Sequence, residues 1–186
     1  MSTREAIIKA GDELVRGRGY HAFSFSDISK TLNIKNASIH YHFPTKADLG
    51  VAIVLQHIEK VDRLIASVKG KNPLVQLKAF MSVYNQTRTG NRICIVGSIA
   101  STLTTVDEEM AKEIKVLVGK LIHWLTSILE DGRTQKIFRF RSAPRTRALM
   151  IAATMLASVQ LSRITGAKDF EAIKDGVLEE LIYIGT

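Results

Sequence analysis

The chain has 186 residues, 46% of them hydrophobic and 24% charged, with a formal net charge of +8. This length allows one sizeable core or two small ones, and the apolar content excludes an intrinsically disordered chain. No apolar run approaches the roughly 18 residues of a membrane-spanning helix, no apolar signal stretch opens the sequence, and one cysteine excludes an internal disulfide framework. We therefore expect a cytoplasmic protein with no membrane partner.

Apolar residues recur every three or four positions almost throughout the chain, and proline and glycine are sparse. This periodicity predicts an all-α fold of about nine helices. Thr3 is expected to cap the first helix, Gly17 to Gly19 to end it, and Ser26 to cap the second. Pro44 stops the third helix, and Thr45 caps the fourth. The expected helices after the first cover residues 27–32, 36–43, 46–68, 74–89, 95–103, 107–132, 144–165 and 169–184.

Turn signals divide this series of helices. Gly90-Asn91 follows the fifth helix, a basic stretch at 133–142 is typical of a loop, and the chain has no internal repeat. The pattern predicts a three-helix head from Thr3 to Phe43, joined through the long fourth helix to a larger helical body. We place the corresponding domains at residues 1–48 and 49–186.

The basic charge is concentrated away from this head. Residues 1–50 hold seven Lys and Arg against five Asp and Glu. A denser stretch without any acid contains Arg133, Lys136, Arg139, Arg141, Arg145 and Arg147. Net charge therefore gives little support for nucleic-acid binding by the head. The basic stretch is either a solvated loop or a source of additional phosphate contacts.

Residues Ser24 to Phe43 have the spacing of a helix-turn-helix, two short helices joined by a tight turn. Phe25, Ile28 and Leu32 recur at helical spacing and share one buried face. Asn33 falls at the turn, where asparagine is among the few residues other than glycine that accept a left-handed backbone.

The helix that follows the turn supplies inward anchors and outward polar groups. Ile34 returns to the core, Ala37 is small enough for the two helices to cross closely, and Ile39 and Phe43 point inward. The remaining side chains are hydrogen-bonding groups of the kind that read base edges or hold phosphates, namely Lys35, Asn36, Ser38, His40, Tyr41 and His42.

Residues 4–50 resemble the DNA-binding head of the TetR family of bacterial transcriptional regulators. The matching segments are Gly19-Tyr20, Phe25-Ser26-Asp27-Ile28-Ser29 and, as the most specific one, Ala37-Ser38-Ile39-His40-Tyr41-His42-Phe43-Pro44-Thr45-Lys46-Ala47-Asp48-Leu49. The chain departs from the family at Asn36, where Lys or Arg is common, at Ala37, where Gly is common, and at His40, where Tyr is common. These departures leave the operator sequence open.

The resemblance implies a role for each matching polar residue. Lys46 is expected to contact a backbone phosphate, helped by its helix N-terminus, and residues 36, 38, 40 and 41 are expected to face the groove. The candidate DNA-binding residues are Ser24, Ser26, Lys35, Asn36, Ser38, His40, Tyr41, His42, Thr45 and Lys46. The implied function is a homodimeric repressor that a small apolar or amphipathic inducer releases from double-stranded operator DNA. A transcriptional activator of the same fold is an alternative.

The resemblance also implies that the last two long helices, 144–165 and 169–184, form the dimer. An Ala- and Ser-rich stripe at Ala152, Ala153, Ala157 and Ser158 suits close helix approach, although the same residues suit packing within one subunit. Dimerisation also follows from DNA reading, because one short helix makes too few contacts for useful specificity.

An inducer pocket requires buried apolar and aromatic side chains in the body. The candidate ligand-binding residues are Phe80, Tyr84, Cys94, Met110, Leu117, Leu121, Trp124 and Met155. Residues at such spacing also form an ordinary core.

Cys94 gives a second alternative, a thiol-based sensor of electrophiles or oxidants. Arg92 can favour the thiolate, whereas Ile93 and Ile95 favour burial and an inert thiol.

The remaining function classes have less support from the sequence. The chain has no Gly-rich phosphate loop, no nucleophile elbow and no cluster with metal-ligand spacing, so we expect neither an enzyme nor a cofactor. A DNA-binding protein without sequence preference, with the basic stretch 133–147 as its main contact, is the other hypothesis.

Overall fold

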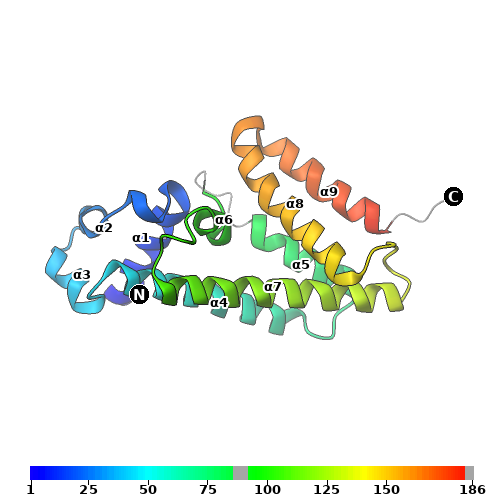
Figure 1. Ribbon diagram of the computed structural model, residues 1–186, viewed down its shortest axis with the longest axis horizontal. Helices are drawn as coiled ribbons and strands as arrows, with labels where there is room; N and C mark the ends of the chain where they lie inside the picture. Colours follow the sequence, from blue (N-terminus) through cyan, green and yellow to red (C-terminus); the bar gives the residue numbers. More distant parts are fainter. Residues whose placement is uncertain (86–91, 183–186) are drawn as a thin grey trace. The chain divides into compact units, whose positions relative to one another are not determined.

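The computed structural model describes residues 1–85 and 92–182. This part contains nine α-helices, one short 3-10 helix and no strand, which confirms the all-α prediction. The helices are α1 (Thr3–Arg18), η1 (Tyr20–Ala22), α2 (Phe25–Leu32), α3 (Asn36–His42), α4 (Lys46–Val68), α5 (Pro73–Asn85), α6 (Ile95–Ala100), α7 (Glu108–Thr134), α8 (Pro144–Thr165) and α9 (Ala167–Ile182) (Figure 1). The predicted end of the fifth helix at residue 89, the turn Gly90-Asn91 and the predicted end of the last helix at residue 184 lie outside the described residues.

The chain forms two compact units. Unit 1 is Met1–Lys60 with Arg92–Val118, and unit 2 is Val61–Asn91 with Gly119–Thr186, of which 61–85 and 119–182 are described. Helices α4 and α7 contribute to both units. The domain boundary between residues 48 and 49 does not coincide with a boundary between these units. It divides the expected DNA-binding head from the expected ligand-binding body, and it stays a prediction.

Capping boxes begin the first two helices, at different residues from those expected. The Ser2 backbone amide donates to Glu5 at 2.7 Å, and the Glu5 amide donates to the Ser2 hydroxyl at 3.2 Å. Ser24 and Asp27 form the equivalent box on α2. Thr3 and Ser26 are therefore not the caps. Ser2 and Ser24 have a carboxylate three residues later to complete the box, whereas the residues three after Thr3 and Ser26 are not acidic.

Thr45 caps α4 as expected from the sequence. The Asp48 amide donates to the Thr45 hydroxyl at 3.1 Å, while the Thr45 amide donates to the Asp48 carboxylate at 2.9 Å. This box fixes the point at which α4 leaves the head, because it satisfies amides that the first turn leaves without helical partners.

The core of unit 1 depends on close helix approach at two glycines. A β-carbon at Gly11 of α1 would lie 3.0 Å from Ile53 of α4, and one at Gly50 of α4 would lie 2.7 Å from the sulfur of Met110 of α7. Ile53 and Met110 are both fully buried. The head is thereby packed directly on the first part of α4 and the first part of α7.

Unit 2 contains an unusually apolar helix, α8. Its 22 residues include an 18-residue stretch with a mean hydropathy of 1.4, which by length and composition is enough to cross a membrane. The expectation that no such stretch exists is wrong, because Ala, Ser and Thr interrupt the runs of large apolar residues without making the helix polar. A single helix of this kind is weak evidence for a membrane span, since core helices of soluble proteins meet the same criteria. Only 28% of the stretch is buried within the chain.

Candidate nucleic-acid interface

The turn between α2 and α3 has the geometry that the helix-turn-helix prediction requires. Asn33 has φ 52° and ψ 47°, a left-handed conformation, and its amide donates to the Ser29 carbonyl. The Ile34 amide donates to the same carbonyl at 3.1 Å. The prediction for Asn33 is confirmed, and the turn directs the chain into α3 at a fixed angle.

Helix α3 is held by two buried anchors and exposes most of its other side chains. Ile39 is fully buried and Phe43, directly after the helix, is nearly so. Tyr41 is 84% exposed, which is unusual for a large aromatic side chain in a rigid helix. Among the other candidates, Ser38 and His42 are half-buried, while the exposed ones are Lys35, Asn36 and His40.

The sequence analysis places Ala37 at the crossing of the two helices. This prediction is wrong, because Ala37 is exposed. Two residues span about 200° on a helix, so Ala37 must face away from the core when Ile39 faces it. Ala37 lies one turn before Tyr41 and shares its outward face. The helical phase of Ile39 and Phe43 already contains this information, so the sequence analysis had the signal and missed it.

His40 is held by its own head. Its ring packs edge-on against Phe25 with a centroid distance of 4.9 Å, and its Nδ1 lies 3.2 Å from the carbonyl oxygen of Pro44. These contacts orient the imidazole at the end of α3, and they leave Nε2 as the ring atom directed to other partners.

Lys46, at the first position of α4, is half-buried between aromatic rings. Its Nζ donates to the Phe23 carbonyl at 2.6 Å and lies 4.9 Å and 4.3 Å from the ring centroids of Tyr20 and Phe23. Burial lowers the pKa of the Lys46 ammonium, although Asp27 opposes this effect. An ammonium has three donors, so this arrangement positions the charge and leaves capacity for a phosphate oxygen.

The three hydroxyl candidates have two different environments. The Ser24 and Thr45 hydroxyls donate to Asp27 and Asp48, each at 2.7 Å, and so belong to the capping boxes. The hydrogen bonds from Ser24 lower the pKa of Asp27 and keep that carboxylate ionised. Ser26 is exposed in the first turn of α2.

The eight ligand candidates are all buried, but they divide between the two units. Cys94, Met110 and Leu117 belong to unit 1, where Met110 and Tyr20 both pack against Gly50. In unit 2, the ring of Phe80 lies 5.8 Å from that of Tyr84 and 5.7 Å from that of Trp124. The other unit 2 candidates are Leu121 and Met155.

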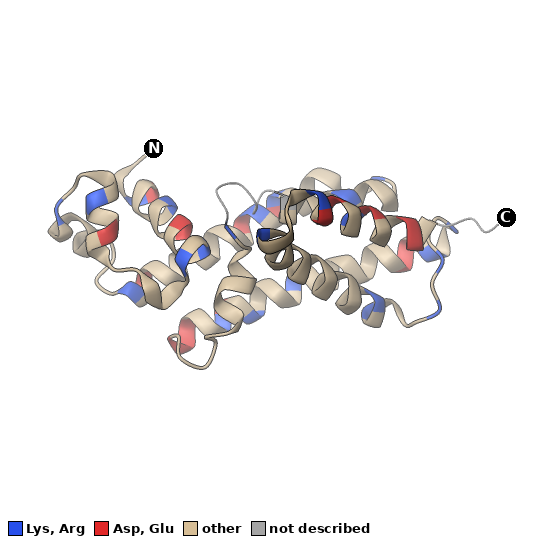
Figure 2. Cartoon of the chain, turned by 90° about the horizontal axis from the view of Figure 1, so that it is seen from above, with Lys and Arg blue, Asp and Glu red and all other residues tan. Residues whose placement is uncertain are grey.

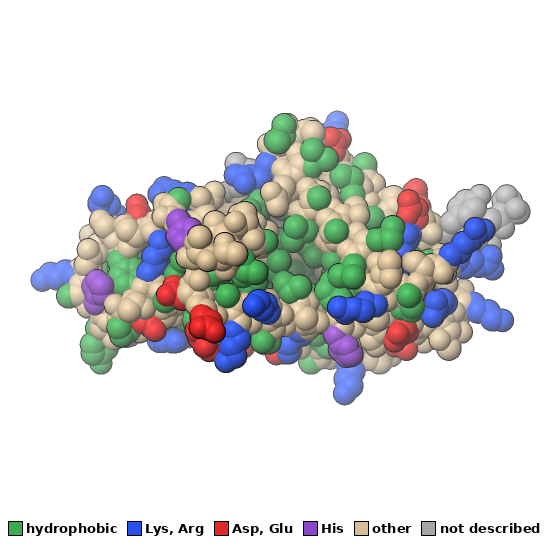
Figure 3. Space-filling view, in the orientation of Figure 1, with side chains coloured by type: hydrophobic (Ala, Val, Ile, Leu, Met, Phe, Trp, Pro, Cys, Tyr) green, Lys and Arg blue, Asp and Glu red, His purple; other side chains and the backbone are tan. Residues whose placement is uncertain are grey.

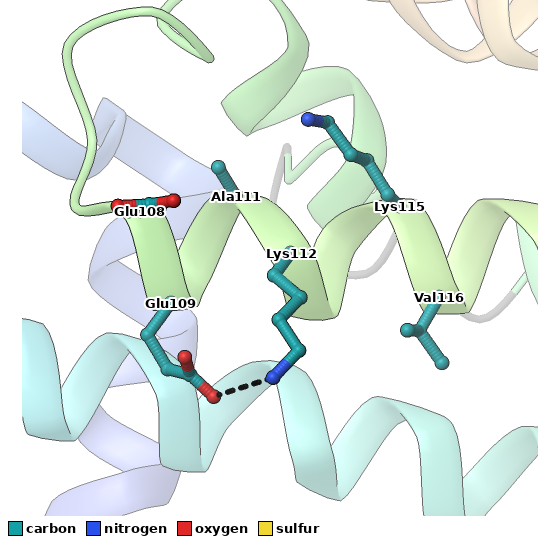
Figure 4. A pocket seen from close by; sticks show the side chains of 6 residues that line it. All are labelled: Glu108, Glu109, Ala111, Lys112, Lys115 and Val116. Carbon is teal, nitrogen blue, oxygen red and sulfur yellow. Dashed lines mark hydrogen bonds and ion pairs between the residues drawn. The ribbon is translucent and has the colours of Figure 1, made fainter.

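An open hollow on α7 has a different character from this apolar cluster. It has a volume of about 880 Å³, and Figure 4 shows its lining side chains along one helix, with Glu109 and Lys112 joined by an ion pair. The lining residues are Glu108, Glu109, Ala111, Lys112, Lys115 and Val116. None of the eight ligand candidates lines it.

Cys94 is buried and caps α6. Its Sγ accepts a hydrogen bond from the Gly97 amide at 3.2 Å. Burial raises the pKa of the thiol, which disfavours the thiolate at neutral pH. The cation that opposes this effect is Arg16, whereas Arg92, which we expected to favour the thiolate, pairs with Glu13 at 3.3 Å.

A buried polar cluster in unit 1 was not predicted from the sequence. Asp12 of α1 accepts from Arg16 at 3.1 Å and lies 2.6 Å from Nε2 of His57 on α4. Arg16 also donates from Nε to the carbonyl of Ile93, just before α6. Only the Asp12–Arg16 spacing is visible in the sequence, because His57 lies 45 residues from Asp12. The cluster connects α1, α4 and the start of the α6 segment.

The head thus has a left-handed turn between two short helices, and the second helix has buried anchors and an exposed polar face. This geometry defines a helix-turn-helix DNA-binding protein. The family model for bacterial regulatory proteins of the tetR family matches residues 7–53. A TetR-family transcriptional regulator from Agrobacterium tumefaciens is 30% identical, with 97% of each chain covered and a TM-score of 0.88. The chain belongs to the TetR family of transcriptional regulators.

Two further relatives match along nearly the whole chain. The transcriptional repressor NemR from Escherichia coli (strain K12) is 24% identical over 196 residues, which cover 99% of this chain and 94% of NemR. The structure of AibR in complex with isovaleryl coenzyme A and operator DNA has the same fold, with a TM-score of 0.78, 21% identity, and 97% and 98% of the two chains covered. The family and the named NemR relative are transcriptional regulators.

Proposed function

We propose that this protein is a homodimeric, cytoplasmic repressor that reads a two-fold operator through α3 and leaves it when a small apolar or amphipathic effector binds unit 2. The observation that carries the DNA-reading part is the outward face of α3, where Ala37 and Tyr41 lie opposite the buried anchor Ile39. Tyr41, Asn36 and His40 offer hydrogen-bonding groups for base edges or phosphates, and the Ala37 methyl suits contact with a thymine methyl.

Lys46 and the helix-start residues have a positioning role in this proposal. Lys46 contributes a charge that the Tyr20 and Phe23 rings hold in place, at the N-terminus of a 23-residue helix. Both the ammonium and the free amides of a helix start attract phosphate. Lys35, Ser24, Ser26, His42 and Thr45 would contact the backbone around this point, while Ser38 is partly covered.

The dimer part of the proposal is supported by apolar side chains that α8 leaves uncovered within the chain. Leu149, Met150, Leu161 and Ile164 are between 47% and 87% exposed. Figure 3 shows hydrophobic side chains at the surface of the region that carries α8 and α9. Isolated surface leucines are ordinary, but a continuous apolar helix face is typical of a protein interface. A second copy of the chain is the occupant that a two-fold operator requires.

The effector part is supported by the buried ring cluster of Phe80, Tyr84 and Trp124, which suits an apolar ligand. Leu121 and Met155 are further buried apolar residues of the same unit. AibR was solved with isovaleryl coenzyme A, and a regulator from Saccharomonospora viridis of the same fold was solved with choline. Operator and effector would each weaken the binding of the other, as linkage requires. The thiol-sensor alternative has less support, because Cys94 is buried and its pKa is raised. The relative NemR is a transcriptional repressor, which favours repression over activation.

The test is selection of duplexes from a random pool by the full chain, followed by affinity and salt titrations. We expect one two-fold sequence to be enriched. Tyr41→Ala and Asn36→Ala should lower discrimination at individual base pairs by roughly tenfold. Lys46→Ala should weaken binding to every duplex and reduce the salt slope by about 0.9.

The matched control is Lys9→Ala, on the exposed side of α1. It should leave the discrimination between base pairs and the salt slope of binding unchanged. If Tyr41→Ala, Asn36→Ala and Lys46→Ala all reduce binding to selected and random duplexes equally, α3 does not read sequence and the proposal is wrong.

A further inference from the structure

We propose that the connection between α7 and α8 in unit 2 binds a small, multiply charged phosphorylated anion. The site consists of Arg133, Lys136, Arg139 and Arg141, and we call it the anion site. None of these residues belongs to α3 or to the ring cluster of Phe80, Tyr84 and Trp124.

The anion site begins a long segment that has basic residues and no acidic ones. The sequence has 26 Lys and Arg against 18 Asp and Glu, and residues 132–168 hold eight of the basic residues and no acidic one. The rest of the chain is therefore balanced, with eighteen of each sign. Figure 2 shows Lys and Arg on the α7–α8 connection with no Asp or Glu between them. Such one-sided charge raises the local concentration of anions.

The backbone that carries these charges is held rigidly rather than extended into solvent. Phe138 is fully buried, and a β-carbon at Gly132 would lie 2.0 Å from its ring, so the ring packs on the glycine itself. The Phe138 amide donates to the Gly132 carbonyl at 3.0 Å, and the Arg139 amide donates to the Leu181 carbonyl of α9 at 2.9 Å. Arg139 and its neighbours are therefore presented from a fixed framework, which lowers the entropy lost on binding.

Lys136 stands at a position where glycine is favoured. Its φ is +58°, its amide donates to the Arg133 carbonyl, and the Ile137 amide donates to the Gly132 carbonyl. These two bonds close α7 as a Schellman motif, whose left-handed residue is usually glycine. A lysine there is less stable than a glycine, because its β-carbon crowds the following carbonyl oxygen. Backbone strain of this kind is typically retained at functional sites.

The side chains of the anion site surround a shallow hollow. Its volume is about 510 Å³, and its lining residues are Arg133, Lys136, Phe138, Arg139, Phe140 and Arg141. The Arg133 guanidinium lies 5.3 Å from the centre of the Phe140 ring, which holds it over the hollow. Guanidinium groups bind phosphoryl oxygens in a bidentate manner, so this set suits a diphosphate group.

Within the described residues, no carboxylate pairs with the four cations of the anion site. Arg147, eleven residues after Lys136, shows the contrast, because it pairs with Glu180 of α9 at 2.9 Å. The four positive side chains of the anion site repel one another, and a bound polyanion offsets this repulsion. A concave site of this size favours a small anion over the convex backbone of duplex DNA.

The test uses inorganic diphosphate as the probe, titrated into the full chain by calorimetry at constant ionic strength and without divalent cations. We expect saturable binding that Arg139→Gln with Arg141→Gln weakens by at least about tenfold. Lys136→Gly should weaken binding by several-fold and also raise the melting temperature, because it relieves the left-handed lysine. A purely structural role for Lys136 predicts the stability gain without loss of binding.

The control is Lys69→Gln with Lys71→Gln, which removes two exposed charges elsewhere in unit 2 and should leave diphosphate binding unchanged. The proposal is overturned if diphosphate does not bind, or if the control weakens binding as much as the double arginine variant. It is also overturned if Arg139→Gln with Arg141→Gln lowers affinity for a random duplex while diphosphate affinity stays the same, because the surface would then serve the DNA backbone. Duplex selection by α3 does not depend on this result, so the proposed function is tested separately.

Discussion

At the residue scale, two charged groups of the head lie partly or fully out of water: Asp12 is buried and Lys46 is half-buried. The Lys46 ammonium lies over two aromatic rings, those of Tyr20 and Phe23. Asp12 is 6% exposed and shares its carboxylate between Arg16 and His57. Burial alone would raise the pKa of Asp12, but His57 and Arg16 outweigh that effect, so the pKa lies below its ordinary value.

Asp12→Asn should therefore destabilise the head by about 3 kcal/mol at neutral pH, because it removes the carboxylate that pairs with both Arg16 and His57 in a largely buried cluster. In the wild-type protein, the ionised carboxylate stabilises the fold above the ordinary pKa of about 4. This contribution is lost as the pH falls through the lower, folded-state pKa. The Asn variant should lack this part of the acid dependence. Urea unfolding as a function of pH measures both effects.

Glu13→Gln is the matched control, since Glu13 is half-exposed and its pair with Arg92 lies at 3.3 Å. Its effect should stay below about 1 kcal/mol. Equal unfolding midpoints for Asp12→Asn and Glu13→Gln would contradict a stabilising role of the cluster.

At the element scale, α7 contains two glycines with opposite expected roles. Gly119 is exposed and nothing lies within 4 Å of the position of its β-carbon, whereas the same position at Gly132 overlaps the Phe138 ring. A glycine inside a helix is ordinarily less stable than alanine. The packing of the α7–α8 connection must reverse this preference at Gly132.

Gly119→Ala should raise the free energy of unfolding by about 0.5–1 kcal/mol. Gly132→Ala should lower it by about 1–3 kcal/mol, because the buried ring has to move. Thermal melts followed by circular dichroism compare the two variants directly. A gain in stability for Gly132→Ala would mean that Phe138 does not pack on that glycine.

At the scale of the whole molecule, α8 exposes large apolar side chains within the single chain. The proposed dimer would cover them. Leu149→Glu with Leu161→Glu should convert dimers to monomers, because two carboxylates would be buried in the contact. Operator affinity should fall as the dimer dissociates, since a monomer makes only half of the contacts with a two-fold operator. Native mass spectrometry and light scattering measure the oligomeric state.

The control is Val75→Glu with Val116→Glu, which adds the same charge at two exposed apolar residues of α5 and α7. This variant should remain a dimer. If the α8 variant keeps the mass of a dimer, then α8 does not form the interface.

The sequence by itself determined those features whose physical causes lie within a few residues of one another. Helical periodicity predicts the nine helices, Asn33 predicts the left-handed turn, and Thr45 with Asp48 predicts the start of α4. Ser2 and Ser24 were missed as caps although their carboxylate partners lie three residues away, so that error belongs to the interpretation and not to the sequence.

Only the tertiary structure decided which distant groups share an environment. It brought His57 to Asp12, Lys46 to the Phe23 carbonyl, Leu181 to Arg139, and divided the eight ligand candidates between two units. The basic stretch after α7 was visible in the sequence, but its rigidity comes from a buried Phe138 ring and from α9. Pairings between residues 23 to 77 positions apart depend on how complete helices pack. Desolvation and hydrogen bonding act there between surfaces that the chain order does not specify.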